Sequence, residues 1–380
     1  MDLACPCRIL TCVGEIFQTG IAPGCASLVA RSIVGIPVRN EADRIGACLT
    51  ALNTQTQPPD VVVLLLNNCT DGSGTVVRAM APWLRFRLDV IQRDLMPARA
   101  NAGHARRLAM QHAAEVAGSA DVLLTTDADA VVPPDWVARN LRALARGADV
   151  VCGRAVIDPV EATLIPAHLH EDDARECQLI ALLDMLAWTL DPEPHDPPPR
   201  HTEASGASLA VGVEIFRRAG GIPDIAAGED RAFVRQLWMM DARVRHDPAI
   251  EVIVSGRIVG RAEGGMADAI RRRMIRQDIF TDDQVEPAEN AYRRYALRGR
   301  VRRAWRGARD NTLASALALP GERLRDCLAL PCFGSVWAAV EAHSPILRRR
   351  RVRFADLLPE IAAAQALLRA ATVPDALAAD

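Results

Sequence analysis

The chain contains no lysine, so all 45 of its basic residues are arginine. Aromatic residues make up only 4% of the sequence, which argues against the aromatic platforms on which single-stranded nucleic acids stack. The formal net charge of −2 lacks the positive excess of a general nucleic-acid binder. We therefore expect no nucleic-acid partner.

The sequence also lacks any uninterrupted apolar run of about 18 residues or more, so we predict no membrane span. Its first thirty residues show no basic segment followed by a clean apolar core, so they do not support a secretory signal. Both absences favour a cytoplasmic location. Because zinc sites prefer CxxC pairs, we expect reduced thiols and no metal cluster at the crowded N-terminal cysteines, Cys5, Cys7, Cys12 and Cys25.

Two phosphate-binding signatures are missing as well. No GxGxxG follows the first predicted strand, and GxxxxGK[ST] does not occur in the chain. Their absence weighs against dinucleotide-binding and P-loop proteins.

The sequence does contain the pattern of an α/β protein. Half of its residues are hydrophobic and 24% are charged, as in ordinary globular domains. Apolar segments bounded by Pro, Gly or polar turns predict strands at residues 31–38, 60–66, 88–91 and 121–126, with helical patterns between them. Strands that alternate with helices predict a mostly parallel sheet flanked by helices.

Three regions follow from this pattern. We predict a poorly ordered extension over residues 1–30 and an α/β domain over residues 31–265. Residues 266–380 are predicted to form an arginine-rich helical C-terminal appendage whose role the sequence does not show.

Two carboxylates stand at the end of the fourth predicted strand. Asp127 and Asp129 lie one residue apart, and side chains at such spacing in an extended segment point to the same side. Paired oxygen ligands suit a hard divalent cation that also holds a diphosphate. The alternative is a surface turn, because Asp is common in turns.

Five segments in order resemble the inverting family 2 glycosyltransferases of the GT-A fold: VGIPVRNEADRIGACLTAL, VVVLLLNNCTDGS, LLTTDADAVVPPDW, HTEASGASLAV and GEDRAF. The resemblance covers about residues 31–265. It implies a GT-A, Rossmann-like and mostly parallel sheet. It also implies transfer of a sugar from a nucleotide diphosphate donor to an acceptor, with Mg²⁺ or Mn²⁺ on the diphosphate.

On the donor side, the resemblance implies contacts from Pro37, Arg39 and Glu41. Asn67 stands where many relatives have an Asp near the nucleoside, which leaves the nucleotide open. Arginines bind phosphate bidentately, so four become candidates for the diphosphate, with a surface charge as the alternative for each: Arg106, Arg107, Arg257 and Arg261. The last two lie in the glycine-rich segment SGRIVGRAEGG, which we predict to be a mobile loop that orders over the diphosphate.

On the metal and acceptor sides, the resemblance assigns Asp127 and Asp129 to the metal and Asp230 to the general base. For Asp230 the alternative is a helix cap. His246 is a third metal candidate, with an ordinary loop histidine as its alternative. The predicted acceptor-side residues are Glu203, Ser205, Gly206 and Glu229.

Two other functions remain open. A metal-dependent nucleotidyltransferase would also use acidic residues, but it needs a glycine-rich loop that residues 37–41 do not supply. A non-catalytic sugar-nucleotide binder would not need Asp127, Asp129 and Asp230 together. The acceptor is left open between a small molecule and a lipid head group.

Overall fold

The computed structural model describes residues 30–258, 260, 266–276 and 278–372. The predicted extension up to residue 29, with its four cysteines, and the candidate Arg261 lie outside the described residues. The six cysteines within the described residues are free thiols. No helix within the described ranges is long and apolar enough to cross a membrane.

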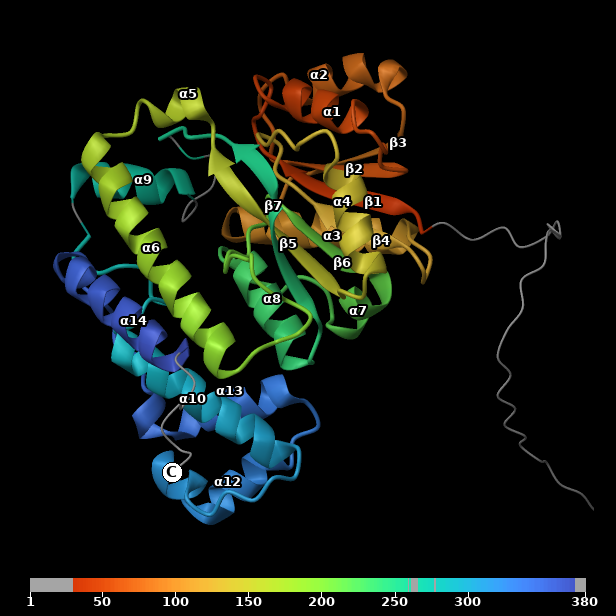
Figure 1. The fold of residues 1–380 in the computed structure, drawn as a ribbon. Coiled ribbons are helices and arrows are strands. Elements are labelled where there is room, and N and C mark those ends of the chain that lie inside the picture. Colours follow the sequence, from red (N-terminus) through yellow and green to blue (C-terminus); the bar gives the residue numbers. More distant parts are fainter. Residues whose placement is uncertain (1–29, 259, 261–265, 277, 373–380) are drawn as a thin grey trace, which may run out of the picture.

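A mixed sheet forms the centre of the part that the structure describes (Figure 1). Its strand order is β3-β2-β1-β4-β6-β5-β7, and β6 alone runs antiparallel to its neighbours β4 and β5. The apolar runs explain the central position of β1 and β2, because their residues are buried on both faces. The strand bounds are β1 (Ser32–Val38), β2 (Val61–Asn67), β3 (Arg87–Arg93), β4 (Val122–Thr125), β5 (Val150–Ile157), β6 (Leu209–Gly212) and β7 (Val244–Val254).

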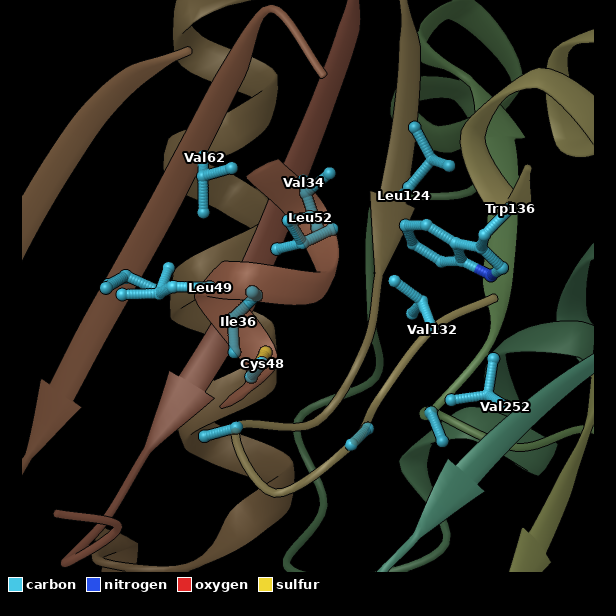
Figure 2. Packing of buried hydrophobic residues seen from close by; sticks show 14 of the residues in the cluster. Val34, Ile36, Cys48, Leu49, Leu52, Val62, Leu124, Val132, Trp136 and Val252 are labelled. Atoms are coloured by element: carbon cyan, nitrogen blue, oxygen red, sulfur yellow. The ribbon is translucent and has the colours of Figure 1, made fainter. Parts of the chain in front are cut away.

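Helices cover both faces of this sheet. Alternate residues of β1 separate the two layers: Val34 and Ile36 pack with α1 and α4, whereas Ile33 packs on the side of α3 and α8. Figure 2 shows the first layer, where Leu49 and Trp136 meet the sheet. The helix bounds are α1 (Ile45–Asn53), α2 (Ser73–Met80), α3 (Ala102–Val116), α4 (Trp136–Ala145), α5 (Pro159–Ala162), α6 (Ala167–Leu190), α7 (Val213–Arg218) and α8 (Glu229–Met239).

The predicted α/β fold with a mostly parallel sheet is confirmed, with one difference in β7. The apolar residues between 251 and 255 predict a strand that begins at Glu251, but the strand begins at Val244. Its pairing with β5 shifts register between Cys152 and Arg154, so residues 247–250 bulge out of the ladder. Pro248 has no backbone N–H to donate to the ladder, and such a residue argues against a regular strand. The first half of β7 therefore could not be predicted from alternating residues.

The predicted C-terminal helices are also confirmed. They are α9 (Met266–Ile275), α10 (Ala288–Trp305), α11 (Leu313–Ala316), α12 (Gly321–Leu328), α13 (Phe333–His343) and α14 (Leu357–Thr372). Leu183 and Leu186 of α6 share a core with α10 and α14, so a helix of the predicted α/β domain packs inside the C-terminal region (Figure 1). The boundary at residue 265 therefore remains a prediction.

The C-terminal region also contacts α8 directly. Asp241, just after α8, accepts hydrogen bonds from the backbone N–H groups of Phe333 (2.7 Å) and Gly334 (2.8 Å). These are two of the free donors at the start of α13, so Asp241 satisfies them. At the other end of α8, Arg231 pairs with Asp282 at 3.1 Å.

Candidate active site

The predicted site residues gather at one edge of the sheet. Asp127 and Asp129 follow β4, and Glu41 follows β1. Because β6 is antiparallel to β4, with Leu209 opposite Thr125, the loop that precedes β6 reaches the same edge. Ligands bind at this edge in open α/β sheets.

Arg106 of α3 lies at the centre of this edge with only 6% of its side chain exposed. Nε donates to Glu229 (2.9 Å), and one Nη donates to Asp127 (2.6 Å). The other Nη donates to Thr125 Oγ1 and to the carbonyl of Gly206, both at 2.9 Å. Burial opposes the charge, but the carboxylates of Asp127 and Glu229 outweigh it and raise the pKa of Arg106.

These contacts argue against the predicted role of Arg106 as a ligand of the donor diphosphate. Four of the five N–H groups of its guanidinium are already used inside the protein. Arg107 is no better placed, because its guanidinium donates to the carbonyl of Ile222. Glu229, a predicted acceptor contact, is buried as the partner of Arg106.

Arg257 occupies the other side of the two aspartates. Its two Nη atoms donate to the carboxylate of Glu41 at 2.7 and 2.6 Å, and one of them lies 3.1 Å from Asp129. Burial opposes the charge, and Glu41 and Asp129 together raise the pKa of Arg257. Burial and the charge of Asp127 raise the pKa of Asp129 to about 6, although Arg257 counteracts them. The side chain of Arg257 is thus held by Glu41 and Asp129 in this structure.

A pocket of about 570 Å³ lies beside this pair. Its lining includes Asp129 and Arg257, Val131 from the segment after β4, and residues around the start of α1 and before α5: Asp43, Arg44, Ala47 and Asp158. The second aspartate therefore borders open space, which Arg257 also faces.

Asp230 lies at the start of α8, where its carboxylate accepts one backbone N–H from outside the helix and one from the next residue of the helix. Oδ2 accepts the backbone N–H of Gly206 at 2.8 Å, and Oδ1 accepts the N–H of Arg231 at 2.7 Å. The N-cap residue of α8 is Gly228, so Asp230 is not the helix cap. The carboxylate remains partly exposed.

The loop before β6 carries the remaining predicted acceptor residues. Glu203 pairs with Arg154 at 3.0 Å, and Ser205 Oγ accepts the N–H of Ala207 at 3.3 Å. Gly206 has a steric reason to be glycine, because a Cβ there would lie 2.4 Å from Arg106 Cζ. The acceptor roles of Glu203 and Ser205 stay predictions.

On the donor side, Pro37 lies in β1 and Arg39 donates to the carbonyl of Ala100. Asn67 ends β2 with 1% of its surface exposed, and its Oδ1 has no hydrogen-bond partner among the described residues. Thr126 Oγ1, beside Asp127, shares this property. Buried polar atoms normally have a hydrogen-bond partner, so both oxygens could accept a hydrogen bond from a ligand or a water molecule.

Comparison with known proteins places this geometry in a family. Residues 33–193 match the family model for glycosyl transferase family 2. The chain carries a glycosyltransferase family 2 domain. The match covers β1 to β5 and identifies the protein as a glycosyltransferase. No curated protein matches the chain.

Solved structures resemble this glycosyltransferase at low identity. The mannosyltransferase PcManGT from Pyrobaculum calidifontis, in complex with GDP-Man and Mn²⁺, is 20% identical over 90% of this chain and 76% of its own, with a TM-score of 0.44. TarS 1-349 from S. aureus, in complex with UDP-GlcNAc, is 14% identical over 84% and 90%, with a TM-score of 0.45. At these values the likeness adds nothing about the donor, the acceptor or a metal.

His246 does not join the metal candidates of the glycosyltransferase. In the sheet it lies opposite Cys152 of β5, with β6 and β5 between it and Thr125 of β4. Its Nδ1 lies 2.8 Å from Asp196 Oδ2. Burial opposes its charge, but contacts with Cys152 and Asp196 raise the pKa of His246 to about 10. The intervening strands keep His246 away from Asp127 and Asp129, which argues against its predicted role as a metal ligand.

One residue near the site was not predicted. Glu161 pairs with Arg44 at 2.6 Å and accepts hydrogen bonds from Ser255 Oγ (3.0 Å) and Gly256 N (2.6 Å). Glu161 thereby fixes the segment that carries Arg257. No sequence signal indicates this role, since the partners lie 94 and 95 residues apart.

Proposed function

We propose that this glycosyltransferase is an inverting, metal-dependent enzyme that moves a sugar from a nucleotide diphosphate sugar to an acceptor hydroxyl. One observation carries the proposal. The metal-type carboxylates after β4 and the separate carboxylate of Asp230 meet at one sheet edge. Arg106 contacts Asp127 there, together with Glu229, the neighbour of Asp230, and Gly206 N–H donates to Asp230.

The donor set of the site fits a divalent cation. Asp127 and Asp129 supply carboxylate oxygens, the ligands that Mg²⁺ and Mn²⁺ take, and the diphosphate and water would supply the others. Burial and the neighbouring charge of Asp127 raise the pKa of Asp129, and a cation would offset the repulsion between the two carboxylates. Within the described residues, no group of three or more His, Cys, Asp or Glu side chains forms a complete site. When bound, the ion would stabilise the charge of the departing diphosphate.

Arg257 is the donor-side arginine in this proposal. Its side chain borders the pocket and is 21% exposed, unlike that of Arg106. A guanidinium binds phosphate in the same bidentate way in which it now binds Glu41. The proposal includes donor contacts from Pro37, Arg39 and Asn67. It also includes a cytoplasmic location.

Asp230 is the general base. Inversion requires a carboxylate that takes the proton of the acceptor hydroxyl opposite the leaving group. Asp230 suits this role because no arginine side chain of the described residues is hydrogen-bonded to it, and the two donors that it does bind are backbone N–H groups. Glu229, the adjacent carboxylate, is buried against Arg106.

The test is a panel of UDP- and GDP-sugars, including UDP-GlcNAc and GDP-mannose, incubated with small hydroxyl acceptors and with lipid head groups. Nucleotide diphosphate release that requires Mn²⁺ or Mg²⁺, with an inverted anomeric centre by NMR, supports the proposal. Asp129→Ala should abolish metal-dependent donor binding while the melting temperature stays unchanged. Retention of configuration, or equal donor affinity in Asp129→Ala, contradicts it.

The same panel separates the alternatives. A nucleotidyltransferase would release pyrophosphate from a nucleoside triphosphate and a sugar phosphate. A non-catalytic binder would bind a donor without releasing nucleotide.

A further inference from the structure

One side chain connects the two chemical ends of the site. Arg106 contacts Asp127, the first of the two metal-type carboxylates, at 2.6 Å. It also contacts Glu229, the neighbour of Asp230 in α8, at 2.9 Å. Arg106 belongs to α3, so its guanidinium joins three separate elements of the fold.

Gly206 adds a second connection to the same base. Its carbonyl accepts from Arg106 at 2.9 Å, and its N–H donates to Asp230 Oδ2 at 2.8 Å. Both groups flank one Cα, so a shift of the Gly206 carbonyl also shifts the N–H that holds Asp230. The chain of contacts runs from Arg106 through Gly206 to the carboxylate of the base.

The packing around this connection leaves little freedom. A Cβ on Gly206 would lie between 2.4 and 2.6 Å from three atoms of the Arg106 guanidinium. The side chain of Arg106 is almost fully buried, and its charge is matched by two carboxylates. A displaced guanidinium would leave both carboxylates without their partner, which strongly disfavours any other position.

We propose that Arg106 is a positioning residue that sets the place of Asp230 relative to Asp127 through Gly206, and that it does not bind the donor. The proposal rests on the proposed role of Asp230 as the base. Proton transfer requires the base within hydrogen-bond reach of the acceptor hydroxyl. A misplacement of about 1 Å lowers the rate by about 10²-fold, whereas donor affinity depends on other residues.

Two variants disturb the connection from opposite sides. Arg106→Lys keeps the positive charge but cannot reach four acceptors at once. Gly206→Ala keeps Arg106 and pushes a methyl group into its guanidinium. The matched controls are Arg107→Lys, one residue along α3, and Gly212→Ala in β6, where a Cβ meets only Ile215 at 3.9 Å.

For both test variants we expect kcat for sugar transfer to fall by about 30- to 100-fold, with the donor KM and the affinity for nucleotide diphosphate and Mn²⁺ within about threefold. Both controls should behave as the unmodified protein. If donor affinity falls as much as kcat, Arg106 contacts the donor and the proposal is overturned. If Arg106→Lys does not fold, Gly206→Ala decides the outcome alone.

Amide hydrogen exchange supplies a readout that needs no activity. In Arg106→Lys, exchange over residues 203–208 and at the start of α8 should become at least about tenfold faster, while β5 stays protected. Unchanged exchange at both places would overturn the proposal. If the unmodified protein transfers no sugar from any donor, the proposed function fails, and the exchange experiment still decides whether Arg106 positions Asp230.

Discussion

Arg106 and Arg257 each pair with one aspartate of the site. The two pairings are similar, but the side chains differ in burial. Arg106 pairs with Asp127 and Glu229, and Arg257 pairs with Asp129 and Glu41. Each guanidinium thus joins one aspartate after β4 to one glutamate from another element. The Arg106 side chain is 6% exposed, whereas that of Arg257 is 21% exposed and borders the pocket.

The difference shows how burial changes the role of the same ion pairing. A buried charge that loses its partner is costly, so Arg106 is fixed in place. A pair that borders water exchanges partners at low cost, because the solvent stabilises the separated charges. Arg106 is therefore suited to hold the site together, and Arg257 to release its carboxylates when a ligand arrives.

The strongest test of this comparison is to remove each charge. Arg106→Met leaves Asp127 and Glu229 without their buried partner, and we expect a loss of about 3–5 kcal/mol in the free energy of unfolding. Arg257→Met should cost less, about 1–3 kcal/mol, because Glu41 is left buried without its partner but Asp129 borders the pocket. Urea unfolding of both variants, with Arg107→Met as the control, measures the difference. Equal losses would contradict the distinction between the two arginines.

A second test concerns Asp230, the carboxylate at this edge that neither arginine holds. Asp230→Asn keeps an oxygen that accepts the Gly206 N–H but cannot take a proton. We expect kcat to fall by about 10²-fold or more, with an unchanged melting temperature and donor affinity. Steady-state kinetics measure this loss. Near-normal transfer would place the base elsewhere, although Glu229 is an unsuitable substitute because Arg106 neutralises it.

A third test uses a buried pair outside the site, His246 with Asp196. The pKa of His246 is raised to about 10, so its pairing stabilises the fold below the unfolded value of about 6.5. That contribution is lost as the pH rises from about 6.5 through 10, so stability should decline over this window.

We expect a decline of about 2–3 kcal/mol between pH 7 and 9, measured by urea unfolding at each pH. In His246→Gln the slope should flatten. An equal slope in this variant would show that other groups govern the pH dependence.

The smallest expected effect sharpens the role of Arg257. Because Arg257 and a metal ion compete for Asp129, Arg257→Gln should strengthen Mn²⁺ binding to the donor-free protein by a few-fold, roughly 1 kcal/mol. The same variant should weaken binding of a nucleotide diphosphate, since a phosphate ligand is lost. Titration calorimetry measures both. Weaker Mn²⁺ binding in Arg257→Gln would rule out the competition.

The sequence was informative where local patterns decide the structure. The strand predicted at residues 60–66 agrees with β2 to within one residue at each end, and the Asp127–Asp129 spacing locates the end of β4. The antiparallel direction of β6 could not be predicted, because a short apolar segment does not indicate which strands it pairs with or in which direction.

The roles of the charged side chains were harder to predict. Arg106 meets Glu229 across 123 residues and Arg257 meets Glu41 across 216, distances over which no sequence period operates. The sequence offered both as phosphate ligands, and only the differing burial separates them. The side chain of His246 can bind a metal, but its position depends on the order of the strands in the sheet. The sequence did not indicate that order, because the bulge interrupts the pattern of β7.

The contacts between the C-terminal region and α8 limit how this enzyme can be divided into fragments. The helix that begins beside Asp230 is tied to Asp282 at one end and, through Asp241, to α13 at the other. A fragment that stops at residue 265 would lose both ties and would expose the leucines of α6 to water. The C-terminal helices are thus not a detachable module, and grafting the catalytic edge onto another protein would require them too.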